Sequence, residues 1–169
     1  TRLTKDRCFI IDPIDGTRSF ISGEITWSHS IAVVENGQVI AGVVHLPATN
    51  VMYSAARGAG AFVGDTRMQV ESVRHVENAR ILANRAVVTS GYWLNGSAPN
   101  FDRHHRPSLA YRMAAVAEGK FDGMITLRPT WEWDVAAGVL MVEEAGGTVC
   151  DRTGNTLLFN NPTPQSRGL

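Results

Sequence analysis

The order of the expected elements predicts an α+β fold or a layered α/β fold. Short apolar segments bounded by turn residues fill the first part of the chain, and helical periodicity appears only after Pro107. The first pattern is typical of an antiparallel sheet, and the second continues as helix, strand, helix and strand. Such elements pack in layers around one core, and 169 residues are enough to bury one.

The composition excludes several classes of function. Hydrophobic residues make up 44% and charged residues 19%, which is typical of a globular domain. Because the formal net charge is zero, no overall positive field draws the chain to nucleic acid polymers or to an anionic membrane. No apolar run is as long as a membrane span, and no signal peptide is visible. Cys8 and Cys150 lie far apart, which favours two buried free thiols and a cytoplasmic location.

The first expected strand is the apolar run at residues 8–11. We interpret it as a buried strand that Pro13 stops, because proline lacks the N–H group that a sheet ladder needs. Asp15 or Thr17 then stands where a side chain caps a short helix that reaches Phe20. The strand and the helix therefore meet at a turn rich in carboxylates.

The clearest pattern is a β-hairpin. Apolar residues at 30–34 and 39–44 flank Asn36 and Gly37, and this pair accepts the positive φ angles of a type I′ turn. Further strands of the same sheet are expected at residues 51–55 and 61–63.

Two helices are expected in the second half. Apolar residues recur at helical spacing from Leu109 to Ala117, and Gly119 ends that run. A second helix covers residues 134–145, with Asp134 at its start and two glycines after it. The strands expected in this part lie at residues 81–83, 86–89, 121–127, 148–150 and 157–159, with a polar loop at 91–106.

The first candidate site is the turn after the first strand. Asp12, Asp15 and the carbonyl of Ile14 can point at one place, and hard cations such as Mg2+ prefer such oxygen ligands. The N–H groups of Gly16 and Thr17 lie at the expected helix start, which favours an anion such as phosphate. The alternative is a solvated turn closed by an Asx hydrogen bond.

The second candidate site is the start of the second helix. Asp134 follows two tryptophans, and small residues follow it. Small residues allow another backbone to approach closely. The alternative is an ordinary helix cap, with Trp131 and Trp133 in the core.

Together the two segments resemble the signatures of the inositol monophosphatase superfamily. Residues 12–17 with Phe20 resemble its Asp-Pro-hydrophobic-Asp-Gly-Thr signature, and residues 133–138 resemble its Trp-Asp-x-Ala-Ala-Gly signature. Residues 47–61 between them are also similar. The resemblance implies the αβαβα sandwich of the inositol monophosphatase and fructose-1,6-bisphosphatase fold.

The resemblance also implies a role for each matching position. Two or three Mg2+ ions are expected, with Asp12 bridging two of them, the Ile14 carbonyl binding one, and Asp15 and Asp134 binding the second. Gly16 and Thr17 are expected to hold the phosphate, and the Thr17 hydroxyl to position the attacking water. Asp12, Asp15, Thr17 and Asp134 are therefore the expected catalytic residues.

Part of the family pattern has no counterpart in the sequence. The resemblance implies a Gly-Glu-Glu segment that supplies a metal ligand, and nothing precedes Thr1. We therefore expect a fragment of a longer enzyme, which by itself binds metal weakly and turns over slowly. Residues 1–65 would be the remainder of an N-terminal sheet subdomain, and residues 66–169 a C-terminal α/β subdomain. A truncated, non-catalytic remnant is the alternative of another class.

Within the superfamily, residues 129–134 are similar to bisphosphate nucleotidases of the CysQ type. This similarity implies hydrolysis of adenosine 3′,5′-bisphosphate to AMP, with Arg112 and Arg128 binding the second phosphate and Glu132 touching the substrate. The alternatives are solvated charges for the two arginines and a helix-start charge for Glu132. The alternative substrates are inositol monophosphate, sugar bisphosphates and histidinol phosphate. The sequence also leaves open whether the protein forms a homodimer.

Two adjacent histidines, His104 and His105, have no partners at a spacing useful for catalysis or metal binding. We expect both to be surface residues.

Overall fold

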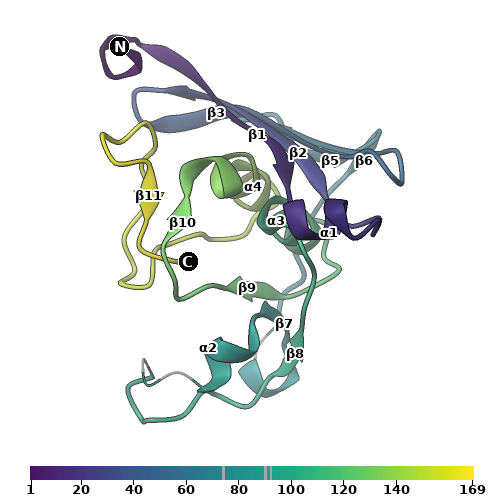
Figure 1. Ribbon diagram of the computed structural model, residues 1–169. Coiled ribbons are helices and arrows are strands. Elements are labelled where there is room, and N and C mark those ends of the chain that lie inside the picture. The colour runs from purple at the N-terminus through teal and green to yellow at the C-terminus, as the bar shows by residue number, and fades with distance from the viewer. Residues whose placement is uncertain (74, 90, 92) are drawn as a thin grey trace.

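An antiparallel sheet of six strands forms one side of the molecule. The computed structural model describes residues 1–73, 75–89, 91 and 93–169. In the sheet each strand pairs with the next one along the chain (Figure 1). The strands are β1 (Arg7–Asp15), β2 (Ser28–Glu35), β3 (Gln38–Leu46), β4 (Val51–Ala56), β5 (Gly60–Val63) and β6 (Thr66–Arg67).

The predicted hairpin is confirmed as β2 and β3. Asn36 and Gly37 have φ angles of 50° and 79°, as a type I′ turn requires. Glu35 then pairs with Gln38 at the base of the turn. The strands predicted at residues 51–55 and 61–63 are also confirmed, as β4 and β5.

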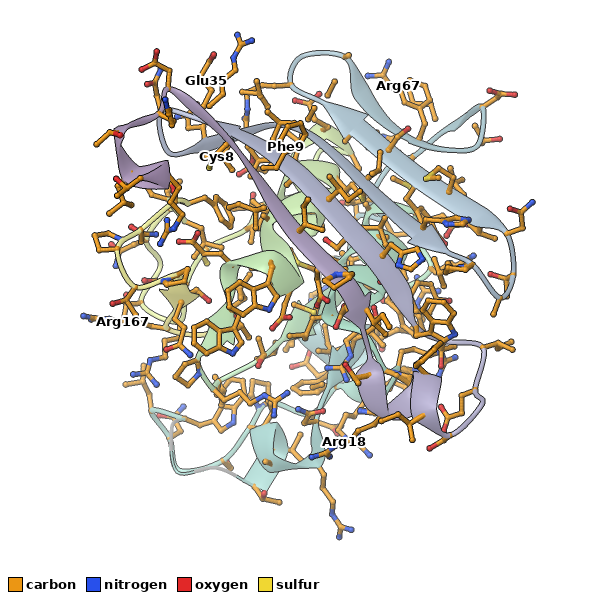
Figure 2. All side chains as sticks on the ribbon, turned by 45° about the horizontal axis from the view of Figure 1, so that its top comes forward. Cys8, Phe9, Arg18, Glu35, Arg67 and Arg167 are labelled. Carbon is orange, nitrogen blue, oxygen red and sulfur yellow. The ribbon has the colours of Figure 1, made fainter. Side chains whose placement is uncertain are left out.

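The prediction that Pro13 stops a buried first strand is wrong. β1 continues through Pro13 to Asp15, with a shift in register between Asp12 and Asp15. It lies at the edge of the sheet, where a residue without an N–H group is tolerated. Its side chains alternate between exposed and half-buried, and Phe9 on the outer side is 69% exposed (Figure 2).

Two helices cover the inner face of the sheet and build the core with it. They are α3 (Leu109–Ala117) and α4 (Glu132–Glu144), which contact each other and β3. Figure 1 shows both of them below the sheet. Gly42 of β3 allows the close approach, because a Cβ there would lie 3.0 Å from the Cα of Ala137. The helix predicted at residues 109–117 is confirmed, and the second one begins two residues before Asp134.

The remaining strands form two small sheets. β7 (Arg80–Ala83) pairs in parallel with β8 (Asp102–His104) on one side and β9 (Gly123–Ile125) on the other. β10 (Thr130–Trp131) pairs with β11 (Gln165–Ser166). The other elements are the helices α1 (Thr17–Ile21) and α2 (Arg85–Thr89) and the 3-10 helices η1 (Arg2–Thr4) and η2 (Val76–Asn78).

Several short elements were predicted wrongly. The β-branched run at residues 86–89 belongs to helix α2, and the expected loop at 91–106 contains β8. Residues 148–150 and 157–159 form no strand in the part of the chain that the structure describes. Phe159 instead donates a single backbone bond to the Gly37 carbonyl, beside the hairpin turn. Short apolar runs carry too little periodicity to separate these outcomes.

The layered α/β prediction is confirmed by this arrangement of sheet and helices. The core cluster contains residues from both predicted segments, 1–65 and 66–169, and their division stays a prediction. Both cysteines are free, but Cys8 is half-buried and Cys150 exposed, so the prediction of two buried thiols is wrong. Among the described residues, no helix combines the length and apolar character needed to cross a bilayer.

Candidate metal and phosphate site

Three carboxylates from distant parts of the chain converge at one point. Asp12 and Asp15 stand at the end of β1, and Asp134 lies in the first turn of α4, which contacts β1. One carboxyl oxygen from each lies within 4.8 Å of the others. The predicted convergence of the three aspartates is therefore confirmed. We call these three residues the acidic triad.

The turn between β1 and α1 shapes one side of the triad. Asp12 Oδ1 accepts a hydrogen bond of 2.9 Å from the N–H of Ile14, and the Thr17 hydroxyl donates one of 3.0 Å to the Ile14 carbonyl. Gly16 is the N-cap of α1 with a φ of 88° and no side-chain cap. The prediction that Asp15 or Thr17 caps this helix is therefore wrong, because the left-handed cap position is taken by glycine.

Asp15 is fixed by the start of α3. It is 8% exposed, and its Oδ2 accepts bonds of 2.7 Å from the Ser108 hydroxyl and from the N–H of Ala110. The Ser108 hydroxyl also accepts a bond from the N–H of Tyr111 and lies 3.0 Å from the Ser28 hydroxyl. Asp15 Oδ1 has no hydrogen bond among the described residues, so it remains available to a ligand.

The triad favours protons or a cation. Burial, together with the nearby charges of Asp15 and Asp12, raises the pKa of Asp134 to about 7. Burial likewise raises the pKa of Asp15 to about 6, and it raises the pKa of Asp12. Desolvated carboxylates close together are unfavourable unless a cation neutralises them. Three converging carboxylate oxygens fit Mg2+, which prefers oxygen ligands.

Arg112 is buried close to the triad. It is 5% exposed, so the alternative of a solvated charge is wrong for this residue. Its guanidinium donates to the Arg106 carbonyl and, at 3.0 Å, to Nε2 of His105. Burial lowers its pKa, while the charge of Asp15 opposes this effect. Arg128 is exposed, and its charge also lowers the pKa of Arg112.

The two adjacent histidines have partners that the sequence did not reveal. His104 is half-buried in β8, and its Nε2 lies 2.7 Å from a carboxyl oxygen of Asp102. His105 is exposed, as predicted, but it accepts the bond from Arg112. His104 thus lies at the surface only in part, with 34% of its side chain exposed and a carboxylate partner that the sequence did not indicate.

Glu132 lies outside the triad. It is 3% exposed, and both of its carboxyl oxygens accept hydrogen bonds from the segment after Phe159. The donors are the N–H of Asn160 at 2.8 Å, the N–H of Asn161 at 3.0 Å and the Asn161 amide at 2.7 Å. These bonds give Glu132 a structural contact in place of a free helix-start charge.

Three residues of the site were missed in the sequence. Ser108 and the N–H of Ala110 donate to Asp15, Ser28 contacts the Ser108 hydroxyl, and no local pattern connects these residues with Asp15. Ser108 carries one usable signal, because serine before an apolar run favours a helix N-cap.

The comparisons with known proteins agree with this site. Residues 1–168 match the model of the inositol monophosphatase family. A fructose-1,6-bisphosphatase/inositol-1-monophosphatase of Thermotoga maritima is 39% identical over 157 residues, covering 88% of this chain and 58% of the relative. A Nus factor SuhB of Haemophilus influenzae is 37% identical over 161 residues, covering 89% of this chain and 59% of the relative.

Solved structures share the fold. An IMPase of Thermotoga maritima superposes with a TM-score of 0.81 at 36% identity, covering 97% of this chain and 65% of that one. The suppressor protein SuhB of Bartonella henselae gives 0.76 at 33% identity, covering 90% and 63%. The chain spans about three fifths of the length of the curated relatives it matches. With two signature segments meeting in one acidic triad and a family match along 168 residues, this chain belongs to the inositol monophosphatase family.

Proposed function

We propose that the chain carries the metal and phosphate site of a Mg2+-dependent phosphatase that hydrolyses inositol 1-phosphate. The convergence of Asp12, Asp15 and Asp134 supports this proposal most directly. The relatives named inositol-1-monophosphatase support the choice of substrate.

Each carboxylate of the triad has a defined part in the proposal. Asp12, Asp15 and Asp134 would hold the cations, together with the Ile14 carbonyl. Bound Mg2+ supplies a Lewis acid and lowers the pKa of water, so that hydroxide is available near neutral pH. Ser108 and Ala110 keep Asp15 in one orientation, and positioned ligands of this kind raise metal affinity.

The turn into α1 would bind the phosphate. The first backbone bond of this turn runs from the N–H of Phe20 to the Gly16 carbonyl, so the N–H groups of Gly16 and Thr17 precede it. Among the described residues neither N–H has a hydrogen-bond partner. We propose that both donate to phosphate oxygens. The Thr17 hydroxyl donates to the Ile14 carbonyl and keeps its lone pairs, so it would accept a hydrogen bond from the attacking water and orient it.

Inositol 1-phosphate is preferred here over the nucleotide bisphosphate that the sequence favoured. The relatives reported above carry inositol monophosphatase or SuhB names, and none of these names is that of a nucleotidase. Arg112, the expected ligand of a second phosphate, is buried and already donates to Arg106 and His105. The preference for a CysQ-type nucleotidase is therefore not supported.

Metal binding and turnover of the complete gene product that contains these residues test the proposal. We expect Mg2+-dependent hydrolysis of inositol 1-phosphate at a higher kcat/KM than of adenosine 3′,5′-bisphosphate. Asp15→Asn should abolish the heat of Mg2+ binding in titration calorimetry. Asp65→Asn, at an exposed aspartate of a turn, should leave this heat unchanged. Preference for the bisphosphate would reject the substrate. Absence of Mg2+ heat in the wild type would support the non-catalytic alternative.

A further inference from the structure

A pair of stacked tryptophans, of which Trp131 is exposed and Trp133 half-buried, stands beside Asp134 in the sequence. The rings of Trp131 and Trp133 lie 4.6 Å apart with an angle of 7° between their planes. Trp131 is 41% exposed, so the interpretation of both tryptophans as core residues is wrong for this one. A large aromatic side chain held at the surface offers a rigid apolar face to a ligand.

The backbone of Trp131 is tied directly to the triad. Its N–H donates a bond of 3.3 Å to Oδ2 of Asp134, which places the tryptophan at the N-cap of α4. Pairing with Gln165 in the small β10–β11 sheet fixes the same residue from the other side. Both the ring and the backbone of Trp131 are therefore held in place before any ligand binds.

The segment before Trp131 carries a positive charge at Arg128. Arg128 is exposed, makes no hydrogen bond or ion pair among the described residues, and lies within electrostatic range of buried Arg112. Arg112 in turn interacts with Asp15. Residues 128–134 therefore carry an exposed cation, a stacked aromatic pair and, at Asp134, one carboxylate of the triad.

We propose that Trp131 is a specificity-determining residue that stacks on the ring of the alcohol part of the substrate. This inference rests on the proposed phosphatase function and adds to it a contact for the ring of a cyclic alcohol. A ring presents a face of C–H groups or of aromatic carbons that can lie on an indole, whereas a small acyclic alcohol has none. A cyclic polyol such as inositol and a nucleoside both present such a ring face to the indole.

Three substrates separate the effect of the ring from that of the phosphate. They are inositol 1-phosphate, adenosine 2′-monophosphate and the acyclic glycerol 2-phosphate. Trp131→Ala should raise KM for the ring substrates about tenfold, as loss of one aromatic stack does. KM for glycerol 2-phosphate should change less than about twofold. Trp131→Phe should keep most of the ring preference, and Leu158→Ala, at an apolar side chain 58% exposed beside the hairpin turn, should change nothing.

Comparing the two ring substrates shows which kind of ring stacks on Trp131. A larger effect on adenosine 2′-monophosphate supports stacking on a base, and an equal effect on both supports stacking on any ring face. An equal rise of KM for all three substrates, or no rise for any, would overturn the proposal.

A binding measurement keeps this test separate from the proposed function. Calorimetry with Ca2+ in place of Mg2+ compares the dissociation constants of inositol 1-phosphate and glycerol 2-phosphate without turnover. If the wild type prefers the ring compound and Trp131→Ala does not, the stacking role holds even where hydrolysis is not observed. If neither protein prefers it, the stacking role fails even where hydrolysis is observed.

Discussion

Ser108, at the start of α3, donates a hydrogen bond of 2.7 Å to Asp15, which stands 93 residues earlier at the end of β1. The same hydroxyl caps α3 by accepting from the N–H of Tyr111. The Ser28 hydroxyl, 3.0 Å away, can donate to its other lone pair. One side chain thus joins the helix start, the sheet and the orientation of a metal-binding carboxylate.

Replacing Ser108 by alanine should therefore weaken both metal binding and the fold. Asp15 would keep only its bond from Ala110, and loss of such a supporting contact typically costs roughly 10- to 100-fold in metal affinity. Loss of the helix cap should lower the free energy of unfolding by about 1 kcal/mol. Calorimetry with Mg2+ and thermal denaturation measure the two effects. Ser54→Ala, on β4, is the matched control, and unchanged Mg2+ affinity in Ser108→Ala would contradict this role.

The stability of the metal-free protein should depend on pH in a defined direction. The pKa values of Asp15, about 6, and Asp134, about 7, lie above the ordinary 3.8. The folded state therefore binds protons more tightly than the unfolded state. This stabilisation is fully present below the ordinary pKa and is lost as pH rises through 6 and 7. The melting temperature without Mg2+ should fall by a few degrees between about pH 5 and pH 8.

Mg2+ and one substitution give the controls for this pH dependence. Saturating Mg2+ should raise the melting temperature more at pH 8 than at pH 5, because the triad is then ionised. Asp134→Asn should flatten the metal-free profile. A metal-free profile that rises from pH 5 to pH 8 would show that the triad is not desolvated as described.

Much of the fold follows from local patterns in the sequence, and the exceptions have physical causes. The hairpin at Asn36 and Gly37 was predictable because its turn needs positive φ angles that few residues accept. Strand β1 was misjudged at Pro13, because its place at the edge of the sheet is a property of the tertiary fold. Residues 86–89 and 157–159 were misjudged because short apolar runs suit helix, strand and coil alike.

The residues of the site were likewise predictable only in part. Asp12, Asp15 and Asp134 were found because their motifs are specific, and the structure brings them together. Their supports were not found, since the contact of Ser108 with Asp15 depends on how α3 meets the sheet. The burial of Arg112 also depends on how α3 meets the sheet, so the sequence did not reveal it.

Glu132→Gln should separate a structural role from a substrate contact. The carboxylate accepts three hydrogen bonds from Asn160 and Asn161, and a glutamine would turn an N–H2 group toward one of these donors. We expect a loss of about 2 kcal/mol in the free energy of unfolding, with Mg2+ affinity and KM unchanged. Chemical denaturation and steady-state kinetics measure these. Glu77→Gln, at an exposed glutamate, is the control. A raised KM at unchanged stability would restore the predicted contact with substrate.

Gly138→Ala should disturb the packing that brings the starts of α3 and α4 together. A Cβ at this position would lie 2.5 Å from Cβ and 2.9 Å from Sδ of Met113, far inside van der Waals contact. Overpacking of this kind costs about 1–3 kcal/mol, and the better helix propensity of alanine returns up to about 1 kcal/mol. We expect a net loss of about 1–2 kcal/mol in chemical denaturation.

A double substitution tests whether Met113 is the cause of that loss. In Gly138→Ala with Met113→Gly the clash is absent, because glycine has no Cβ, so the two substitutions together should cost less than the sum of their separate losses. Since α3 carries Ser108 and α4 carries Asp134 at their starts, Gly138→Ala alone should also weaken Mg2+ binding. Additive losses in the free energy of unfolding would show that α3 and α4 move apart without strain. Unchanged Mg2+ affinity in Gly138→Ala would show that the triad does not depend on the separation of the two helices.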